Sequence, residues 1–384
     1  MKFIATTFFG LEQSLAEEIV QWGGTHVSTL NRAVSFKGDL KTLYSINLWS
    51  RTALRVLRPI LEFKAHNETV LYQRVKRFDW TKIIKSHETF VINATVHSEH
   101  FKHSQYVIYK VKDAIVDRIR SSSNGRRPSI DSKDPDVTIR VHCQQKNFSI
   151  SLDSSGDSLH KRGYRERGGE APLNEALAAG MILLSGWNHH EPLYDPMCGT
   201  GTVLAEAGLI AKNVPPRYKW DQFGFMKWRD YDPTIWNEVK SESLELKNDA
   251  SYEIYGNDKL RKSVWMTQMT LQKLNLSDIK LSTSDFFDSP SPSDEGVIIT
   301  NPPYGLRLGS EEMGPFYRQI GDTLKQYYDG WRAWILSGNI PAIKKLGLRT
   351  SKKLSLYNGS VPCKYHLYEM YKGTKKRGES AKES

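Results

Sequence analysis

An apolar, strand-like run that ends in Asn301-Pro302-Pro303-Tyr304 holds the side chains best suited to chemistry. This tetrapeptide can present an amide oxygen, a backbone carbonyl on a rigid Pro-Pro step and an aromatic face. Asn301 Oδ1 and the Pro302 carbonyl could accept both N–H donors of an exocyclic amine on a nucleobase, while Tyr304 stacks on the base. The two acceptors would aim the amine nitrogen and stabilise the charge that develops as it attacks a methyl sulfonium. A proline-rich turn after a strand is the alternative interpretation.

The segment from Leu193 to Thr202 joins a short strand to a helix through small residues. Its glycines would let the backbone approach a ligand, but the third glycine of a dinucleotide fingerprint and the lysine of a P-loop are both missing. A carboxylate at the strand end favours an ammonium group over a pyrophosphate, which it would repel. The amino-acid end of S-adenosylmethionine fits this description. This pattern singles out Asp195, Gly199 and Gly201.

Two further carboxylates follow the next two strands of the same region. Asp258 is expected to accept hydrogen bonds from the ribose hydroxyls, as acidic residues do at this place in nucleotide sites. Asp285 is expected to accept from the adenine amino group, with Phe286 packed against the ring. Either carboxylate alone could be a helix cap or a solvated loop residue. Two of them at successive strand ends favour a binding site.

The elements that must position these residues are predicted from hydrophobic periodicity. Strand and helix signals alternate in residues 1–65 and again up to Asp153, which indicates α+β units. From Pro192 to Leu336, repeated strand–helix pairs predict a doubly wound, mostly parallel sheet, and Asn358-Gly359 between two final strands predicts an antiparallel hairpin. Residues 213–250 are expected to form an irregular insertion.

Composition narrows the class of partner. The 384 residues carry 54 basic and 43 acidic side chains, a net charge of +11, of which residues 1–160 contribute 23 − 16 = +7 and the remainder 31 − 27 = +4. This excess favours a polyanionic partner bound towards the N-terminal part. No apolar run approaches the ~20 residues of a membrane-spanning helix. The start turns acidic too early for a signal peptide, and the three cysteines form no pair, so a cytoplasmic, metal-free protein is expected.

Four motifs together resemble the THUMP-domain RNA guanine-N2 methyltransferases, and most of all the bacterial group that methylates large-subunit ribosomal RNA. They are Asp195-Pro-Met-Cys-Gly-Thr-Gly-Thr, Asn301-Pro-Pro-Tyr-Gly-Leu-Arg-Leu-Gly, Arg162-Gly-Tyr-Arg with Ala171-Pro-Leu-Asn-Glu, and Phe223-Gly-Phe-Met-Lys-Trp. The resemblance covers essentially the whole chain. It implies that Asp195, Pro196, Gly199, Thr200 and Gly201 line the methionine end of S-adenosylmethionine. It implies a ferredoxin-like domain over residues 1–65, a THUMP RNA-binding domain over 66–157 and a Rossmann-like, class I methyltransferase domain over 158–384 that uses S-adenosylmethionine.

The target base remains open at this point, because guanine-N2 and adenine-N6 methylation both use an Asn/Asp-Pro-Pro-Tyr edge. Members of this group are often labelled adenine-specific DNA methylases. We expect N2 of a guanosine in 23S ribosomal RNA. Methylation of transfer RNA, adenine-N6 methylation of DNA or RNA, and a non-catalytic RNA-binding protein with a degenerate methyltransferase fold are the alternatives.

Weaker features concern the contact with RNA. Arg126 and Arg127 in a Ser/Gly loop, and Arg307 just beyond Tyr304, are expected to contact phosphates or the base. His97, His100 and His103 are spaced by three but read as a polar loop rather than a metal site. Four aromatic residues of the insertion could form local core or a wall around a flipped base, with equal weight. They are Trp220, Phe223, Phe225 and Trp228.

Overall fold

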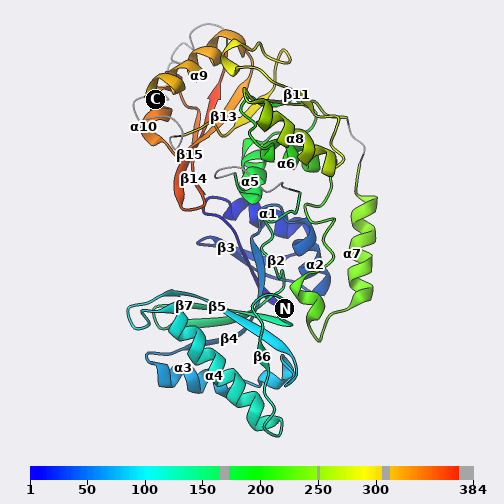
Figure 1. The fold of residues 1–384 in the computed structure, drawn as a ribbon, viewed down its shortest axis with the longest axis vertical. Helices are drawn as coiled ribbons and strands as arrows, with labels where there is room; N and C mark the ends of the chain where they lie inside the picture. The colour runs from blue at the N-terminus through cyan, green and yellow to red at the C-terminus, as the bar shows by residue number, and fades with distance from the viewer. Residues whose placement is uncertain (165–172, 249–250, 305–311, 372–384) are drawn as a thin grey trace, which may run out of the picture. The chain divides into compact units, whose positions relative to one another are not determined.

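The computed structural model describes residues 1–164, 173–248, 251–304 and 312–371. These residues form two compact units (Figure 1). Unit 1 comprises Met1–Thr7, Leu15–Lys161 and Pro215–Leu244. Unit 2 comprises Phe8–Ser14, Arg162–Val214 and the chain from Glu245 onward. The chain therefore passes between the units several times, and residues distant in sequence share a core.

Unit 1 is built on an eight-stranded sheet in the order β2-β3-β1-β4-β8-β7-β5-β6. Its strands are β1 (Lys2–Thr6), β2 (Thr25–Leu30), β3 (Ala33–Lys37), β4 (Arg55–Lys64), β5 (Thr89–His97), β6 (Ser129–Ile130), β7 (Val137–Gln144) and β8 (Asn147–Asp153). Strand β4 pairs with β1 through its first residues, from Arg55 to Leu57, and with β8 from Leu57 to Lys64. One long strand thus joins the two halves of the sheet.

The helices that lie wholly or mostly in unit 1 are α1 (Glu12–Gln21), α2 (Leu40–Trp49), α3 (Glu68–Arg77), α4 (Ser104–Ser122) and α7 (Pro233–Glu245), with short 3-10 helices η1 (Trp80–Lys82) and η2 (Gly224–Lys227). Side-chain caps set two of the starts: Asp39 accepts from the backbone N–H of Thr42, and Asn67 from that of Val70. Helices α3 and α4 lie side by side (Figure 1).

The aromatic insertion belongs to the core of unit 1. Phe225 is fully buried and stacks on Tyr44 with ring centroids 4.2 Å apart, while Trp236 meets Tyr44 edge-on. Arg58 lies over the Trp228 ring and pairs with Asp230. Of the two interpretations of the insertion, local core is the one that the structure supports. The alternative, a wall around a flipped base, is not supported, because Phe223, Phe225 and Trp228 are buried in this cluster.

We expect Phe225→Leu to lower the free energy of unfolding by about 1–2 kcal/mol, because a smaller side chain leaves the Tyr44 ring without its stacking partner. Leu244→Ala, in the same insertion but 72% exposed, should change it by less than about 0.5 kcal/mol. Urea unfolding of both variants measures the difference. Equal stabilities would contradict the assignment of the insertion to the core.

Unit 2 holds a seven-stranded sheet in the order β11-β10-β9-β12-β13-β15-β14. Its strands are β9 (Leu193–Asp195), β10 (Ile254–Asn257), β11 (Lys280–Ser282), β12 (Val297–Thr300), β13 (Arg332–Ser337), β14 (Lys352–Asn358) and β15 (Val361–Glu369). The first five are parallel to one another, and the hairpin β14–β15 is antiparallel to β13. The predicted fold class, with its terminal hairpin, is confirmed.

Helices cover both faces of this sheet. They are α5 (Glu175–Ser185), α6 (Thr202–Ala211), α8 (Arg261–Lys273), α9 (Met313–Tyr327) and α10 (Ile340–Ile343), with η3 (Phe286–Asp288) and η4 (Lys344–Leu346). Helix α9 packs on the face that carries Ile298 and Tyr368. Tyr365, three residues before Tyr368 and so on the opposite face, donates its hydroxyl to the Met181 carbonyl of α5. The carboxyl ends of the central strands meet at one edge between these layers.

The elements that the sequence did not predict include a helix within residues 213–250 and a strand near the N-terminus. Residues 213–250 are not wholly irregular, because α7 occupies Pro233–Glu245 and buries Trp236 and Val239. Strand β2 was not expected, since five of its six residues are exposed and the strand lies at the edge of the sheet. In both elements few apolar residues are buried, so hydrophobic periodicity does not reveal them.

Candidate active site

The site is assembled where β9 and β12 end side by side. These neighbouring parallel strands bring Asp195 and Thr300 together, and the Thr300 hydroxyl donates to Asp195 Oδ1 across 2.8 Å. The backbone N–H of Met197 donates to the same oxygen. Asn301 follows Thr300 directly. The two segments singled out from the sequence therefore share one edge of the sheet.

Asp195 is only 2% exposed, and burial raises the pKa of its carboxyl to about 7, with the nearby Asp258 carboxylate adding to the rise. Both of its hydrogen bonds go to Oδ1, so Oδ2 has no hydrogen-bond partner among the described residues. A buried carboxylate with an open oxygen is stabilised by a cation. This observation fits the ammonium and sulfonium charges of S-adenosylmethionine, which Asp195 would hold at its methionine end.

The cofactor affinity is expected to fall on acidification, because the ligand's ammonium binds the carboxylate form of Asp195. With a pKa of about 7 in the free protein, protonation should weaken binding roughly twentyfold between about pH 7.5 and 5.5. Little further gain is expected above that range. Calorimetric titration with S-adenosylmethionine measures the profile, and Asp195→Asn is the control that should flatten it. An unchanged affinity at the lower pH in the wild type would contradict this account.

The glycine loop after β9 has the backbone geometry that only glycine adopts readily. Gly199 and Gly201 have φ values of +56° and +76°, and a Cβ on Gly201 would lie 2.6 Å from Cγ2 of Thr267. Thr267 also donates its hydroxyl to the Gly199 carbonyl. Thr200 and Pro196 lie in the same loop, where Thr200 is partly exposed and Pro196 buried. The loop is therefore fixed by α8 before any ligand arrives.

Asp258 and Asp285 both make local hydrogen bonds at their strand ends. Asp258 accepts from the backbone N–H groups of Gly199 and Leu260, across 3.0 and 2.9 Å. Asp285 accepts from the N–H of Phe287 and caps η3. The structure thus places Asp258 against the glycine loop, and Asp285 at the end of the neighbouring strand. Their contacts with ribose and adenine stay predictions.

Phe286 lies elsewhere than expected. It is 3% exposed and packs on Tyr328, with ring centroids 5.5 Å apart, in the core of unit 2. The Phe286 ring therefore packs inside the protein, because the first residue of η3 turns towards the sheet. Phe287, the next residue, is only partly buried. In this structure Phe286 presents no free ring to an adenine.

Asn257 is the positioning residue that sequence reasoning missed. It is fully buried at the end of β10, and its side-chain amide donates to the carbonyls of Pro196 and Ser284. Its Oδ1 accepts from the Ser282 hydroxyl and from the N–H and hydroxyl of Ser284. One side chain thus ties together the loops that follow three strands. Its place directly before Asp258 was the available signal.

Asn301 carries a buried acceptor that suits a hydrogen-bond donor of a substrate. Its Oδ1 is buried and accepts no hydrogen bond from any residue that the structure describes. A buried acceptor without a donor costs about 1–3 kcal/mol, so such groups call for a partner. No backbone N–H of the described residues donates to the Pro302 carbonyl either. Pro302 is buried, Pro303 is exposed and Tyr304 is partly buried.

The remaining predicted residues fall into two groups. Arg126 and Arg127 are exposed in the loop after α4 of unit 1, where a phosphate could reach them. Arg307 lies outside the described residues.

No group of three or more histidine, cysteine or acidic residues is arranged to hold a metal ion within residues 1–164, 173–248, 251–304 and 312–371. Within the same ranges, no helix has the length and apolarity needed to cross a membrane.

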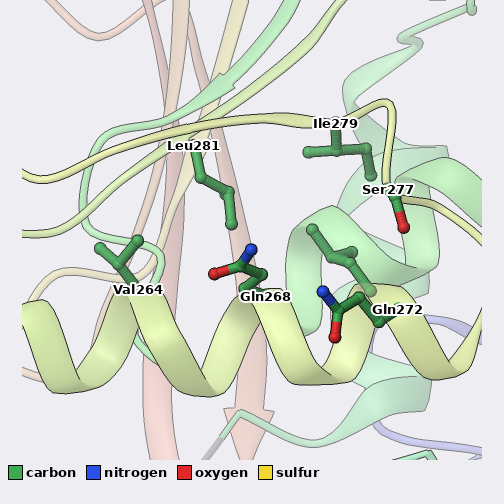
Figure 2. A pocket seen from close by; sticks show the side chains of 7 residues that line it. Val264, Gln268, Gln272, Ser277, Ile279 and Leu281 are labelled. Carbon is green, nitrogen blue, oxygen red and sulfur yellow. The ribbon is translucent and has the colours of Figure 1, made fainter.

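A cavity of about 280 Å³ lies beside α8 (Figure 2). Val264 and Gln268 of α8 line it together with Leu281 of β11. None of the residues predicted to bind the cofactor is among its lining. The cavity therefore adds nothing to the site at the ends of β9 and β12.

Comparison with known proteins defines the class. Residues 162–366 match the family described as RMKL-like, methyltransferase domain. Residues 2–57 match the RlmL ferredoxin-like domain, and residues 65–153 match the THUMP domain. The chain belongs to the RMKL-like methyltransferase family, which confirms the resemblance seen in the sequence. S-adenosylmethionine is the methyl donor that this membership implies.

Individual relatives give the same assignment. A putative RNA methyltransferase of Synechocystis is 40% identical over 372 residues, which are 96% of this chain and 97% of the relative. The ribosomal RNA large subunit methyltransferase K/L of Syntrophotalea carbinolica is 35% identical over 95% of this chain, but the chain spans only 53% of that protein. A crystal structure of a putative methyltransferase complexed with SAH has a TM-score of 0.88 and 29% identity, covering 97% of this chain and 99% of that one.

Proposed function

We propose that this methyltransferase transfers the methyl group of S-adenosylmethionine to the exocyclic N2 of a guanosine in large-subunit ribosomal RNA. The observation that carries the proposal is the buried, unpartnered Oδ1 of Asn301, one residue from the Thr300–Asp195 hydrogen bond. Adjacent parallel strands lie about 4.8 Å apart. A methyl donor held at Asp195 and an amine held at Asn301 would therefore be neighbours.

Different residues bind the cofactor and the target base. Asp195 binds the cationic end of the cofactor, Asp258 the ribose and Asp285 the adenine. Asn301 Oδ1 and the Pro302 carbonyl accept the two N–H donors of the base amine, which aims its nitrogen at the methyl group. Tyr304 stacks on the base after it has left the RNA helix. When bound, S-adenosylmethionine supplies an electrophilic methyl group for direct transfer, so no nucleophilic side chain is required.

RNA is proposed as the substrate on three grounds. The relatives named above are described as RNA or ribosomal RNA methyltransferases, and residues 65–153 match a THUMP domain. The first 160 residues also carry the larger share of the positive charge. We propose that residues 1–65 and 66–157, with Arg126 and Arg127, bind RNA phosphates, while residues 158–384 carry out the transfer. A cytoplasmic location follows from a ribosomal substrate.

The test is methyl transfer to a panel of substrates with the purified protein. Deproteinised 23S ribosomal RNA, total transfer RNA and unmethylated DNA are each incubated with labelled S-adenosylmethionine, and the nucleosides are separated by mass spectrometry. We expect N2-methylguanosine in the ribosomal RNA alone. Methyladenine in any substrate, or N2-methylguanosine only in transfer RNA, would overturn the proposed target. No transfer and no cofactor binding would favour a non-catalytic RNA-binding protein.

A further inference from the structure

Tyr304 is held from outside its own segment by the hairpin β14–β15. Its hydroxyl accepts a hydrogen bond from the side-chain amide of Asn358, across 2.7 Å. A Cβ on Gly338, just after β13, would lie 2.9 Å from Cδ2 of the Tyr304 ring and 2.9 Å from Cγ1 of Val361. The ring thus rests on a glycine and on the hairpin end. Burial raises the pKa of the Tyr304 hydroxyl, which keeps it protonated.

The hairpin turn does not itself need Asn358. The sequence suggested Asn358-Gly359 as the turn, but Asn358 pairs with Val361 as the last residue of β14, so the loop is Gly359-Ser360. Gly359 has a φ of +62°, whereas Asn358 does not have a positive φ. The asparagine therefore has no role in the backbone of the turn. Its side-chain amide instead donates a hydrogen bond to the hydroxyl of Tyr304.

The hairpin is itself supported by the segment Phe8–Ser14, which belongs to unit 2. Phe9 meets the Tyr357 ring edge-on, with centroids 5.7 Å apart. A Cβ on Gly10 would lie 2.5 Å from the Ser355 carbonyl oxygen, so the backbones are in direct contact. The end of β14 is consequently braced next to the residue that bonds Tyr304.

We propose that Asn358 is a positioning residue that fixes the Tyr304 ring in the orientation needed to stack on the target base. The inference rests on the role proposed for Tyr304 above. A tyrosine ring that becomes ordered only on binding loses conformational entropy, which offsets part of the stacking energy. A ring that is already fixed avoids this cost. Asn358 supplies this order through one hydrogen bond, while Gly338 leaves room for the ring.

A double-mutant cycle tests the proposal. Asn358→Ala and Tyr304→Phe each remove the same hydrogen bond, one from either side, and each should lower kcat/KM for 23S ribosomal RNA between about twofold and tenfold. The double variant should be no slower than the slower single variant, because the bond can be lost only once. Affinity for S-adenosylmethionine should not change. Asn358→Asp should recover most of the rate, since the tyrosine can then donate to the carboxylate.

Ser360→Ala, at the exposed end of the same hairpin, is the matched control and should leave the rate unchanged. Effects of Asn358→Ala and Tyr304→Phe that multiply in the double variant would overturn the proposal, as would a wild-type rate in Asn358→Ala. Tyr304→Phe also covers the case in which Asn358→Ala disturbs the hairpin. A wild-type rate in Tyr304→Ala would instead overturn the proposed role of Tyr304, so the two failures are distinguishable.

Discussion

Asn301→Ala is expected to lower the rate of methyl transfer at least about a hundredfold, while the affinity for S-adenosylmethionine stays nearly the same. The amide oxygen is buried without a donor among the described residues, so a substrate amine would be the group that satisfies it. Removing the acceptor leaves one N–H of the base unpaired at the moment when positive charge develops on nitrogen. Single-turnover transfer to ribosomal RNA measures the loss, and calorimetry measures cofactor binding.

Two variants sharpen this prediction. Asn301→Asp keeps an acceptor at the same position and should retain more activity than alanine. Asn237→Ala, on the exposed side of α7, should behave as wild type. If Asn301→Ala transferred methyl groups as fast as the wild type, Asn301 would have no place in the mechanism. A parallel loss of cofactor affinity would instead assign Asn301 to the cofactor site.

Asp195→Asn is expected to weaken S-adenosylmethionine binding between about tenfold and a hundredfold, because hydrogen bonds to a charged group contribute roughly 1.5–3 kcal/mol. The substitution keeps the shape of the side chain and leaves an oxygen for the Thr300 hydroxyl. Only the charge is lost. Asp288→Asn, exposed in η3, is the matched control and should bind normally.

Asp195→Asn also distinguishes an effect on cofactor affinity from an effect on the stability of the fold. Burial raises the pKa of Asp195 above its unfolded value, so its ionised form is disfavoured in the folded state. The cost is absent below the unfolded pKa, grows as pH rises from there to about 7, and is fully present above that pH. Asp195→Asn should therefore melt no lower than the wild type at about pH 8, although it binds the cofactor more weakly. A large drop in melting temperature would show that Asp195 serves folding instead.

The central part of the fold could be predicted because its signals are local. The apolar run from Val297 to Thr300 ends in polar residues. Gly199 and Gly201 mark the loop before α6 in the sequence, and both adopt positive φ in the structure. Parallel strands then bring their carboxyl ends together. For this reason Asp195 and Asn301, 106 positions apart, were expected at one edge.

The missed features depend on contacts between distant segments. For Phe225 the sequence left local core and a wall around the base equally open. It packs against Tyr44, and no local pattern reveals such a partner. Asn257 carries no motif, yet it connects three loops through buried hydrogen bonds. Asn358 was interpreted as a turn residue, because asparagine before glycine usually is one. Each of these roles follows from tertiary structure.

The most direct test of the proposed function is nucleoside mass spectrometry of 23S ribosomal RNA from a strain that lacks the gene, complemented with either the wild type or Asn301→Ala. We predict that deletion removes an N2-methylguanosine, that the wild type restores it and that the variant, expressed at the same level, does not. An unchanged N2-methylguanosine content in the deletion strain, or full restoration by Asn301→Ala, would contradict it.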